Sequence, residues 1–301
     1  MEALLDCLRA LGIDVKEHCP LAPHSSFRVG GEARAAVFPS SREALLQTLD
    51  AARQSAVRYA VFGNASNVVF SDEGFDGLVI FTGNCKRVIC RERIIEADCG
   101  AMLSRVALTA REHALCGAEF MHGIPGTVGG AVFMNAGAYD GSIADVCVRS
   151  EYWDAECGEV GVMEHADHAF GTRTSVYAKN PSRYVILGAT FSFTEGDPAQ
   201  IRAKMEDFAA RRRRTQPLEY PSAGSVFKRP VGHYAGKLIE DCGLKGTRIG
   251  GAEVSERHAG FIINRGGATA EDIRALTQLI RERVQAQTGV DLECEIRFIE
   301  A

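Results

Sequence analysis

The spacing of apolar residues predicts alternating helices and short strands along most of the chain. Leu45, Leu49 and Ala52 recur at helical spacing and predict a helix over residues 42–56. Every second residue from Val185 to Phe193 is apolar, which predicts a strand with one buried face. Further strands are predicted at residues 57–62, 68–70, 78–81, 87–90, 94–98, 146–154 and 225–228. Elements in this order indicate a mixed α/β protein.

Capping residues predict where several helices begin and end. Gly117 follows a predicted helix at residues 101–114, in the position where a left-handed residue often ends a helix. Thr269 and, three residues later, Asp272 form a capping-box pattern at the start of a long helix. Gly289 is the expected end of that helix.

The length of 301 residues is sufficient for about two domains. The best candidate for a linker is the polar segment Glu195-Gly196-Asp197-Pro198. The helix predicted after it ends in a run of four arginines at residues 211–214. We therefore expect a domain boundary near residues 196–197.

Composition and charge exclude several classes of protein. Lys and Arg number 34 against 39 Asp and Glu, and a net charge of −5 argues against a nucleic-acid-binding protein. The apolar runs are too short to span a membrane, and the first residues lack the positive charge of a signal peptide. The ten cysteines show neither a CxxC motif nor zinc-ligand spacing. We therefore expect reduced thiols, no metal and a cytoplasmic location.

Two glycine-rich loops are the main candidates for ligand binding. The first consists of Gly63, Asn64, Ala65, Ser66 and Asn67. The second consists of Gly123, Ile124, Pro125, Gly126, Thr127, Val128, Gly129 and Gly130. Such loops offer backbone N–H groups to phosphate, because no side chain blocks a close approach. Neither loop matches the GxGxxG or GxxxxGK[ST] pattern, and either alone is compatible with an ordinary turn. Together they favour a long ligand with a diphosphate, such as a dinucleotide.

Seven segments carry a resemblance to a known family. In chain order they read SSFRVGG, GNASN, SDEGFDGLVI, GIPGTVGGAVFMNAGAY, FGTRTS, SAGSVFKRP and LECEIRF, from residue 25 to residue 298. With these segments the chain resembles the UDP-N-acetylenolpyruvoylglucosamine reductases, flavoproteins of peptidoglycan precursor synthesis. The short span between Arg173 and Tyr184 resembles the shorter of the two types in that family, which lacks an extra tyrosine-bearing loop.

The resemblance implies a fold, a reaction and two cofactors. The fold is a vanillyl-alcohol-oxidase-like FAD-binding fold of two α/β subdomains, followed by a C-terminal α/β domain for the substrate. This predicts a lead-in at residues 1–24, an FAD-binding domain at 25–196 and a substrate domain at 197–301, with the FAD subdomains dividing near residues 85–86. NADPH would reduce non-covalently bound FAD, and hydride would then pass to the enolpyruvyl group of UDP-N-acetylglucosamine enolpyruvate. The two glycine-rich loops would hold FAD, and no nucleic acid, membrane or protein partner is implied.

The resemblance also implies three catalytic residues, Arg173, Ser225 and Glu295. Hydride addition places negative charge on the carbon beside the substrate carboxylate, and a guanidinium such as that of Arg173 binds a carboxylate through two hydrogen bonds. Ser225 would give a proton to that carbon. Glu295 would hydrogen-bond the enolate if burial raised its pKa and kept it protonated. In the apolar alternation from Leu292 to Phe298, Glu295 falls on the face away from the core.

Each of these residues also has an ordinary interpretation. Apart from the family, Arg173 would be a salt-bridge arginine, Ser225 a turn serine and Glu295 a solvated carboxylate. Arg213 and Lys228 are candidates for the diphosphate of the substrate. Arg213 could equally belong to a cation cluster that balances the C-terminus of its helix, and Lys228 has a comparable structural interpretation.

The sequence departs from the family pattern at three positions and leaves two other functions open. Ala65 stands where glycine is usual, Thr172 where tyrosine is usual and Cys294 where proline is usual. The first departure affects the fit of the diphosphate, because alanine does not freely adopt positive φ. The alternatives are an FAD-dependent sugar or alcohol oxidase of the same fold and a non-catalytic flavin-binding module. Oxygen consumption with alcohols would indicate the oxidase. Bound flavin without any turnover that depends on Ser225 would indicate the non-catalytic module.

Overall fold

The computed structural model describes residues 1–139 and 141–301, which form two compact units. Unit 1 consists of Met1–Glu17, Ala35–Asn64 and Gly77–Arg211. Unit 2 consists of His18–Arg34, Ala65–Asp76 and Arg212–Ala301. Each unit thus combines segments that are far apart in the sequence, and the domain boundaries expected from the sequence stay a prediction.

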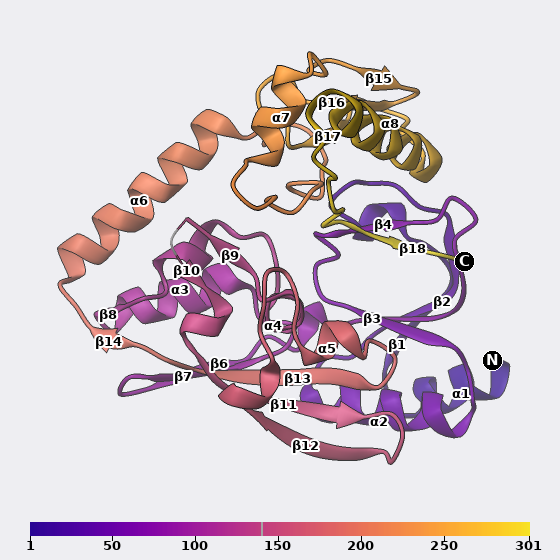
Figure 1. Ribbon diagram of the computed structural model, residues 1–301. Coiled ribbons are helices and arrows are strands. Elements are labelled where there is room, and N and C mark those ends of the chain that lie inside the picture. The colour runs from indigo at the N-terminus through magenta and orange to yellow at the C-terminus, as the bar shows by residue number, and fades with distance from the viewer. Residues whose placement is uncertain (140) are drawn as a thin grey trace. The chain divides into compact units, whose positions relative to one another are not determined.

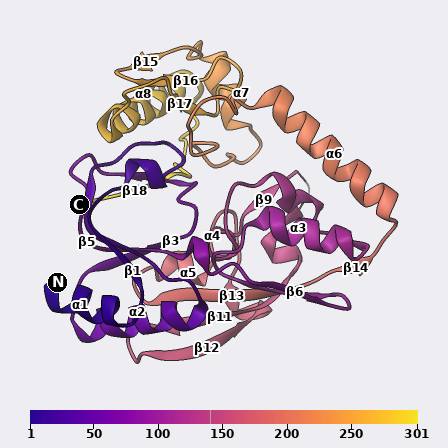
Figure 2. The same cartoon turned by 180° about the vertical axis from the view of Figure 1, so that it is seen from behind.

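Helices and strands alternate along the chain, as Figures 1 and 2 show from opposite sides. The α-helices are α1 (Glu2–Ala10), α2 (Arg42–Gln54), α3 (Leu103–Glu112), α4 (Val128–Met134), α5 (Val176–Lys179), α6 (Pro198–Thr215), α7 (Ala235–Asp241) and α8 (Ala270–Thr288). Short 3-10 helices are η1 (Ala22–His24), η2 (Thr82–Asn84), η3 (Glu119–Gly123), η4 (Ile143–Asp145) and η5 (His165–His168).

The strands are mostly short. They are β1 (Asp14–Pro20), β2 (Glu32–Phe38), β3 (Tyr59–Phe62), β4 (Val68–Phe70), β5 (Phe75–Phe81), β6 (Val88–Arg91), β7 (Ile94–Asp98), β8 (Leu115–Cys116), β9 (Gly137–Ala138), β10 (Gly141–Ser142), β11 (Cys147–Asp154), β12 (Glu159–Glu164), β13 (Tyr184–Ser192), β14 (Thr194–Glu195), β15 (Arg248–Ile249), β16 (Ala252–Val254), β17 (Ile262–Asn264) and β18 (Arg297–Ile299). One sheet has the order β1-β2-β5-β3, with β3 and β5 parallel. Within residues 1–139 and 141–301, every helix is too short or too polar to cross a membrane.

A five-stranded antiparallel sheet of order β12-β11-β13-β7-β6 is the framework of unit 1. Helix α4 contacts β7 and β13 of this sheet. A separate apolar cluster joins Trp153 and Leu187 of the sheet to Leu45 and Leu49 of α2. The sheet is therefore buried against a different core on each side.

The prediction of one buried face on β13 is wrong. Glu151 of β11 pairs with Gly188, whereas Tyr152 pairs with Ile186, so the register shifts at Leu187. A bulge of this kind reverses which face the following residues occupy. Leu187 accordingly packs in the α2 core, whereas Ala189, two residues later, packs in the core on the other face.

The predicted end of α3 also needs correction. The helix ends at Glu112, and Ala114 rather than Gly117 is the first residue after it with left-handed backbone, at φ 54°. Gly117 also has positive φ, 106°, but it lies beyond β8. The chain therefore turns three residues earlier than the glycine signal indicated.

In unit 2, helix α8 lies over the three-stranded sheet β15-β16-β17 (Figure 1). The predicted capping box is confirmed, because Thr269 and Asp272 exchange two hydrogen bonds of 3.0 Å. The carboxylate of Asp72 accepts hydrogen bonds from the first two N–H groups of α8. It thereby supplies acceptors for donors that have no partner within the helix. Gly289 ends the helix at φ 75°, as predicted.

The predicted strand at residues 225–228 is not a regular strand. Ser225 forms an isolated antiparallel bridge with Phe261, and Phe227 forms one with Cys294. The apolar alternation from Leu292 to Phe298 likewise becomes this bridge followed by the short strand β18. These pairs bring residues 225–227 beside residues 293–296 within unit 2.

Candidate functional site

Arg173 occupies a tight turn in unit 1. Gly171 and Thr174 exchange two backbone hydrogen bonds, of 3.0 and 3.4 Å, and thereby close a two-residue turn of Thr172 and Arg173. Arg173 has left-handed backbone, with φ 54°, a conformation that costs a bulky residue about 1–3 kcal/mol. Its half-buried guanidinium donates a hydrogen bond of 3.0 Å to the carbonyl of Gly137. The strained backbone shows that neighbouring contacts determine where this side chain lies.

Two buried side chains connect this turn to the end of α4. Asn135 donates a 2.9 Å hydrogen bond to the carbonyl of Gly171. Ser175, fully buried, donates one of 2.7 Å to the carbonyl of Phe133 and also caps α5. Neither residue was predicted from the sequence as part of the site. An asparagine directly after an apolar helix is the signal that could have indicated Asn135.

A buried polar network lies close to the same turn. The hydroxyl of Ser150 is 2.7 Å from Nε2 of His168 and 2.6 Å from the hydroxyl of Tyr177. The ring of His168 stacks on Phe170, three residues before Arg173, with ring centroids 4.6 Å apart. Burial lowers the pKa of His168 and raises that of Tyr177, so both groups are held neutral.

The second glycine-rich loop contains a buried hydroxyl, that of Thr127. No hydrogen-bond partner for Oγ1 of Thr127 exists among the described residues. A Cβ added at Gly63 would lie 1.9 Å from this oxygen, so the first loop approaches it too closely for any side chain. Asn64 holds the two loops together with a 2.7 Å hydrogen bond to the carbonyl of Pro125. A close backbone approach beside an unsatisfied hydroxyl fits the binding of a phosphate-containing cofactor such as FAD.

Only part of the second loop can supply backbone donors. The N–H of Val128 donates to the carbonyl of Ala101, and that of Gly129 donates to Cys99, each at 2.8 Å. In the first loop, by contrast, the N–H groups of Asn64, Ala65 and Ser66 have no acceptor within residues 1–139 and 141–301. Within the described residues the N–H groups of Gly126 and Thr127 in the second loop likewise have no acceptor, so both loops offer N–H groups to a phosphate.

Ala65 adopts left-handed backbone in spite of its side chain. Its φ is 43°, and the residue is buried. Its carbonyl accepts a hydrogen bond of 3.3 Å from the N–H of Ser26. Contacts in the fold thus impose on alanine the conformation that glycine adopts freely.

Ser225 and Glu295 lie on adjacent segments of unit 2. The N–H of Glu295 donates a 2.7 Å hydrogen bond to the carbonyl of Val226, next to Ser225. Asn67 holds the other side of Glu295, because its amide donates to the Glu295 carbonyl at 3.1 Å and its carbonyl accepts from the N–H of Arg297 at 3.0 Å. Ser225 is exposed and Glu295 is half-buried. The backbones of the two sequence-predicted residues therefore lie on paired segments of unit 2.

The two predicted substrate cations differ in their surroundings. Lys228 pairs with Glu293 beside a surface cavity of about 400 Å³, which Arg229 and His233 also line. Arg213 is exposed on α6. Lys228 is therefore the better placed of the two to contact a bound ligand.

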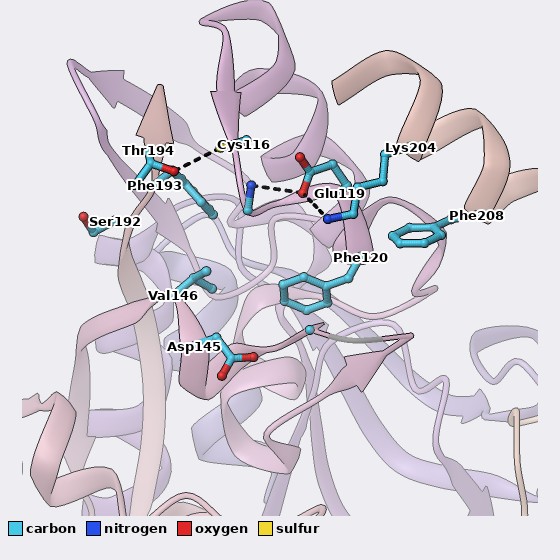
Figure 3. A pocket seen from close by; sticks show the side chains of 12 residues that line it. Cys116, Glu119, Phe120, Asp145, Val146, Ser192, Phe193, Thr194, Lys204 and Phe208 are labelled. Atoms are coloured by element: carbon cyan, nitrogen blue, oxygen red, sulfur yellow. Dashed lines mark hydrogen bonds and ion pairs between the residues drawn. The ribbon is translucent and has the colours of Figure 1, made fainter. Parts of the chain in front are cut away.

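A second cavity, of about 350 Å³, lies in unit 1 and contains none of the predicted site residues (Figure 3). The buried carboxylate of Glu119 accepts the N–H of Gly117 at 3.0 Å and pairs with Lys204 of α6 at 3.7 Å. Phe120 and Phe208 line the cavity beside this pair. The carboxylate of Glu119 thus has its hydrogen-bond and ion-pair partners within the chain. The ion pair with Lys204 connects α6 to η3.

Comparison with known proteins identifies the family. The family model of the C-terminal domain of UDP-N-acetylenolpyruvoylglucosamine reductase matches residues 216–299, and a model of FAD binding domains matches residues 33–162. The UDP-N-acetylenolpyruvoylglucosamine reductase of Caldicellulosiruptor bescii is 49% identical over 97% of this chain and 93% of its own length. This chain belongs to the UDP-N-acetylenolpyruvoylglucosamine reductase family. The reductase of Clostridium perfringens, strain SM101, is 43% identical over 95% of this chain and 93% of its own.

A solved structure from the same family confirms the fold. The crystal structure of the Thermus caldophilus reductase covers 95% of this chain and 98% of its own, with 31% identity and a TM-score of 0.79. The predicted FAD-binding fold with a C-terminal domain is therefore confirmed, as is FAD as cofactor. The FAD-binding match includes both glycine-rich loops, and the reductase match includes Ser225 and Glu295. Arg173 lies between the two matched regions.

Proposed function

We propose that this chain uses NADPH and FAD to reduce UDP-N-acetylglucosamine enolpyruvate to UDP-N-acetylmuramate in peptidoglycan precursor synthesis. The observation that carries the proposal is the 49% identity to a named reductase over 97% of the chain. The side chains that this reaction needs are present: a cation on a fixed turn in unit 1, and a hydroxyl and a carboxyl group on paired backbone segments of unit 2. NADPH is the reductant that the family resemblance implies.

The two glycine-rich loops would hold FAD. The hydroxyl of Thr127 and the N–H groups of Asn64, Ala65 and Ser66 are the donors for its diphosphate. When bound there, FAD supplies a hydride carrier that can be reduced by one molecule and oxidised by another. Asn67 has a different role in this proposal, because its side chain already holds Glu295.

Arg173 would bind the carboxylate of the enolpyruvyl group. Reduction adds a hydride to the terminal carbon, and the electron pair of the double bond moves toward the carbon beside the carboxylate. A guanidinium stabilises that charge through two hydrogen bonds and stays protonated at every physiological pH. A guanidinium carries five N–H donors, so the bond to Gly137 can orient the group while another edge meets a carboxylate.

Ser225 would complete the reaction by protonating the carbon beside the carboxylate. Its exposure within unit 2 lets a substrate reach the hydroxyl. An alcohol is a weak acid, so this transfer requires a strongly basic carbon such as the enolate provides. Glu295, placed beside Ser225 by the bond to Val226, would stabilise the same charge as a hydrogen-bond donor.

Ser225→Ala tests the proposal because it separates the two halves of the reaction. NADPH should reduce the flavin at the parent rate, because that half needs no proton from serine. Oxidation of the reduced flavin by the enolpyruvyl nucleotide should slow by about 10²–10⁴, the usual contribution of a general acid. Stopped-flow absorbance of the flavin measures both rates.

Ser222→Ala is the matched control, since Ser222 lies three residues earlier in the same segment and is not in the proposed mechanism. It should keep both rates. Ser225→Cys should recover part of the lost rate, because a thiol of pKa near 8.5 is a better acid than an alcohol. Unimpaired oxidation in Ser225→Ala would remove Ser225 from the mechanism, and equal slowing of both halves would indicate poor folding.

A further inference from the structure

Asn135 connects two loops of unit 1 through its side chain. It follows α4 with left-handed backbone, at φ 44°, and only 9% of it is exposed. Its amide nitrogen donates a 2.9 Å hydrogen bond to the carbonyl of Gly171. Its amide oxygen accepts one of 2.9 Å from the N–H of Ala144. Both polar atoms of the side chain are therefore used to fix backbone.

The bond to Gly171 acts on the turn that carries Arg173. Gly171 and Thr174 close that turn by their mutual backbone hydrogen bonds, so a displacement of Gly171 moves Arg173. The guanidinium of Arg173 in turn donates to Gly137, two residues after Asn135. The segment from Asn135 to Gly137 thus holds both the base of the turn and the charged end of the side chain.

Asparagine meets three demands at position 135 together. The backbone needs positive φ, which asparagine tolerates better than other residues with side chains. The side chain must donate to Gly171 and accept from Ala144 at once, as an amide does. Glycine would satisfy the first demand alone, and an ionised aspartate could only accept.

We propose that Asn135 is a positioning residue, which acts on the reaction by fixing the Arg173 turn. The inference rests on the proposed function in one respect, namely that Arg173 binds the substrate carboxylate. A displacement of about 1 Å in a group that orients a reactant can cost on the order of 10²-fold in rate. Loss of the Asn135 side chain should therefore slow the oxidation of reduced flavin by the enolpyruvyl nucleotide by about 10–100-fold.

Asn135→Gly and Asn135→Asp are the informative substitutions. Glycine keeps the left-handed backbone and removes both side-chain bonds. Aspartate keeps the acceptor for Ala144 and replaces the donor to Gly171 with a carboxylate oxygen. Both variants should retain FAD with the parent absorption spectrum and should be reduced by NADPH at the parent rate. Asn180→Ala is the control, because it removes a similar 2.8 Å amide bond, to Val176, on the exposed side of α5. It should keep both rates.

A double-mutant cycle distinguishes positioning of Arg173 from a structural role. Arg173→Ala alone should slow the second half-reaction, and adding Asn135→Gly should cost less than about twofold more, because neighbours that act through one group are not additive. Additive losses would overturn the inference, as would lost FAD or equal slowing of both half-reactions in the Asn135 variants.

The same measurements separate this inference from the proposed function. If the single variant Arg173→Ala reoxidised its flavin slowly and the single variant Asn135→Gly did so at the parent rate, the role of Arg173 would stand and that of Asn135 would be refuted. Arg173→Ala at the parent rate would refute the proposed role of Arg173 and, with it, any positioning of that role by Asn135.

Discussion

The two units hold their candidate catalytic residues by different means. In unit 1, the side chains of Asn135 and Ser175 reach across to backbone carbonyls and fix the Arg173 turn. In unit 2, backbone pairing does most of this work, since the N–H of Glu295 donates to the carbonyl of Val226 and the N–H of Lys228 to that of Glu293, with one added side-chain bond from Asn67 to the Glu295 carbonyl. The site in unit 1 should therefore respond to side-chain changes at a distance from the reacting group. Apart from changes at Asn67, the site in unit 2 should tolerate such substitutions while its backbone hydrogen bonds persist.

Among substitutions that test this difference between the units, Arg173→Lys should have the largest effect on the reaction rate. Lysine keeps the positive charge but loses the planar fork that binds a carboxylate through two bonds. Oxidation of reduced flavin by the enolpyruvyl nucleotide should slow by about 10²–10³, the usual cost of one preorganised donor. Single-turnover absorbance measures the rate. Arg93→Lys, which changes an exposed arginine paired with Glu195, should react like the parent. A parent-like rate in Arg173→Lys would show that the substrate carboxylate is not bound through two hydrogen bonds from Arg173.

A smaller effect, on stability, is expected from the buried network beside the same turn. Burial lowers the pKa of His168 below its unfolded value near 6.5, so the unfolded chain binds more protons between these two pKa values. The stability that depends on neutral His168 is complete above about pH 6.5 and decreases as the pH falls toward the folded pKa. The free energy of unfolding should change by up to about 1.4 kcal/mol per pH unit in that window.

His168→Gln tests this dependence by urea unfolding at pH 7.5 and 5.5. The variant should lose less stability on acidification than the parent does. Part of the loss should remain, because burial also lowers the pKa of His122 and His258. His233→Gln replaces an exposed histidine and should keep the parent response. An unchanged response in His168→Gln would mean that protonation of the network does not limit stability.

Features that depend on nearby residues could be predicted from the sequence. The capping box at Thr269 and the helix end at Gly289 were correct, because each depends on a few neighbouring residues. The family motifs supplied the candidate residues, and the structure places Ser225 beside Glu295. The boundary of α3 was missed because alanine rather than glycine adopts the left-handed conformation there.

Features that depend on distant residues could not be predicted. The bulge at Leu187 depends on how β13 pairs with β11, and nothing in the local pattern marks it. The contact from Asn135 spans 36 residues to Gly171, and that from Asn67 spans 228 residues to Glu295. Asn67 stands in a loop that the sequence assigns to FAD, and Asn135 lies five residues after the second such loop, yet both side chains hold backbone.

The smallest effect is expected from Cys294→Pro, in the unit that relies on backbone pairing. Cys294 pairs with Phe227, but the hydrogen bonds of this bridge are made by the residues on either side of the pair. The N–H of Cys294 itself has no acceptor in the described part of the chain. Proline removes an N–H and restricts φ, so the free energy of unfolding should change by less than about 1 kcal/mol. Lys228→Pro should cost more, because the N–H of Lys228 donates to the carbonyl of Glu293 at 2.9 Å. Urea unfolding of both variants, with Lys228→Ala to account for the lost side chain, measures the contrast. Equal losses for the two prolines would show that backbone pairing is not what holds Glu295 beside Ser225.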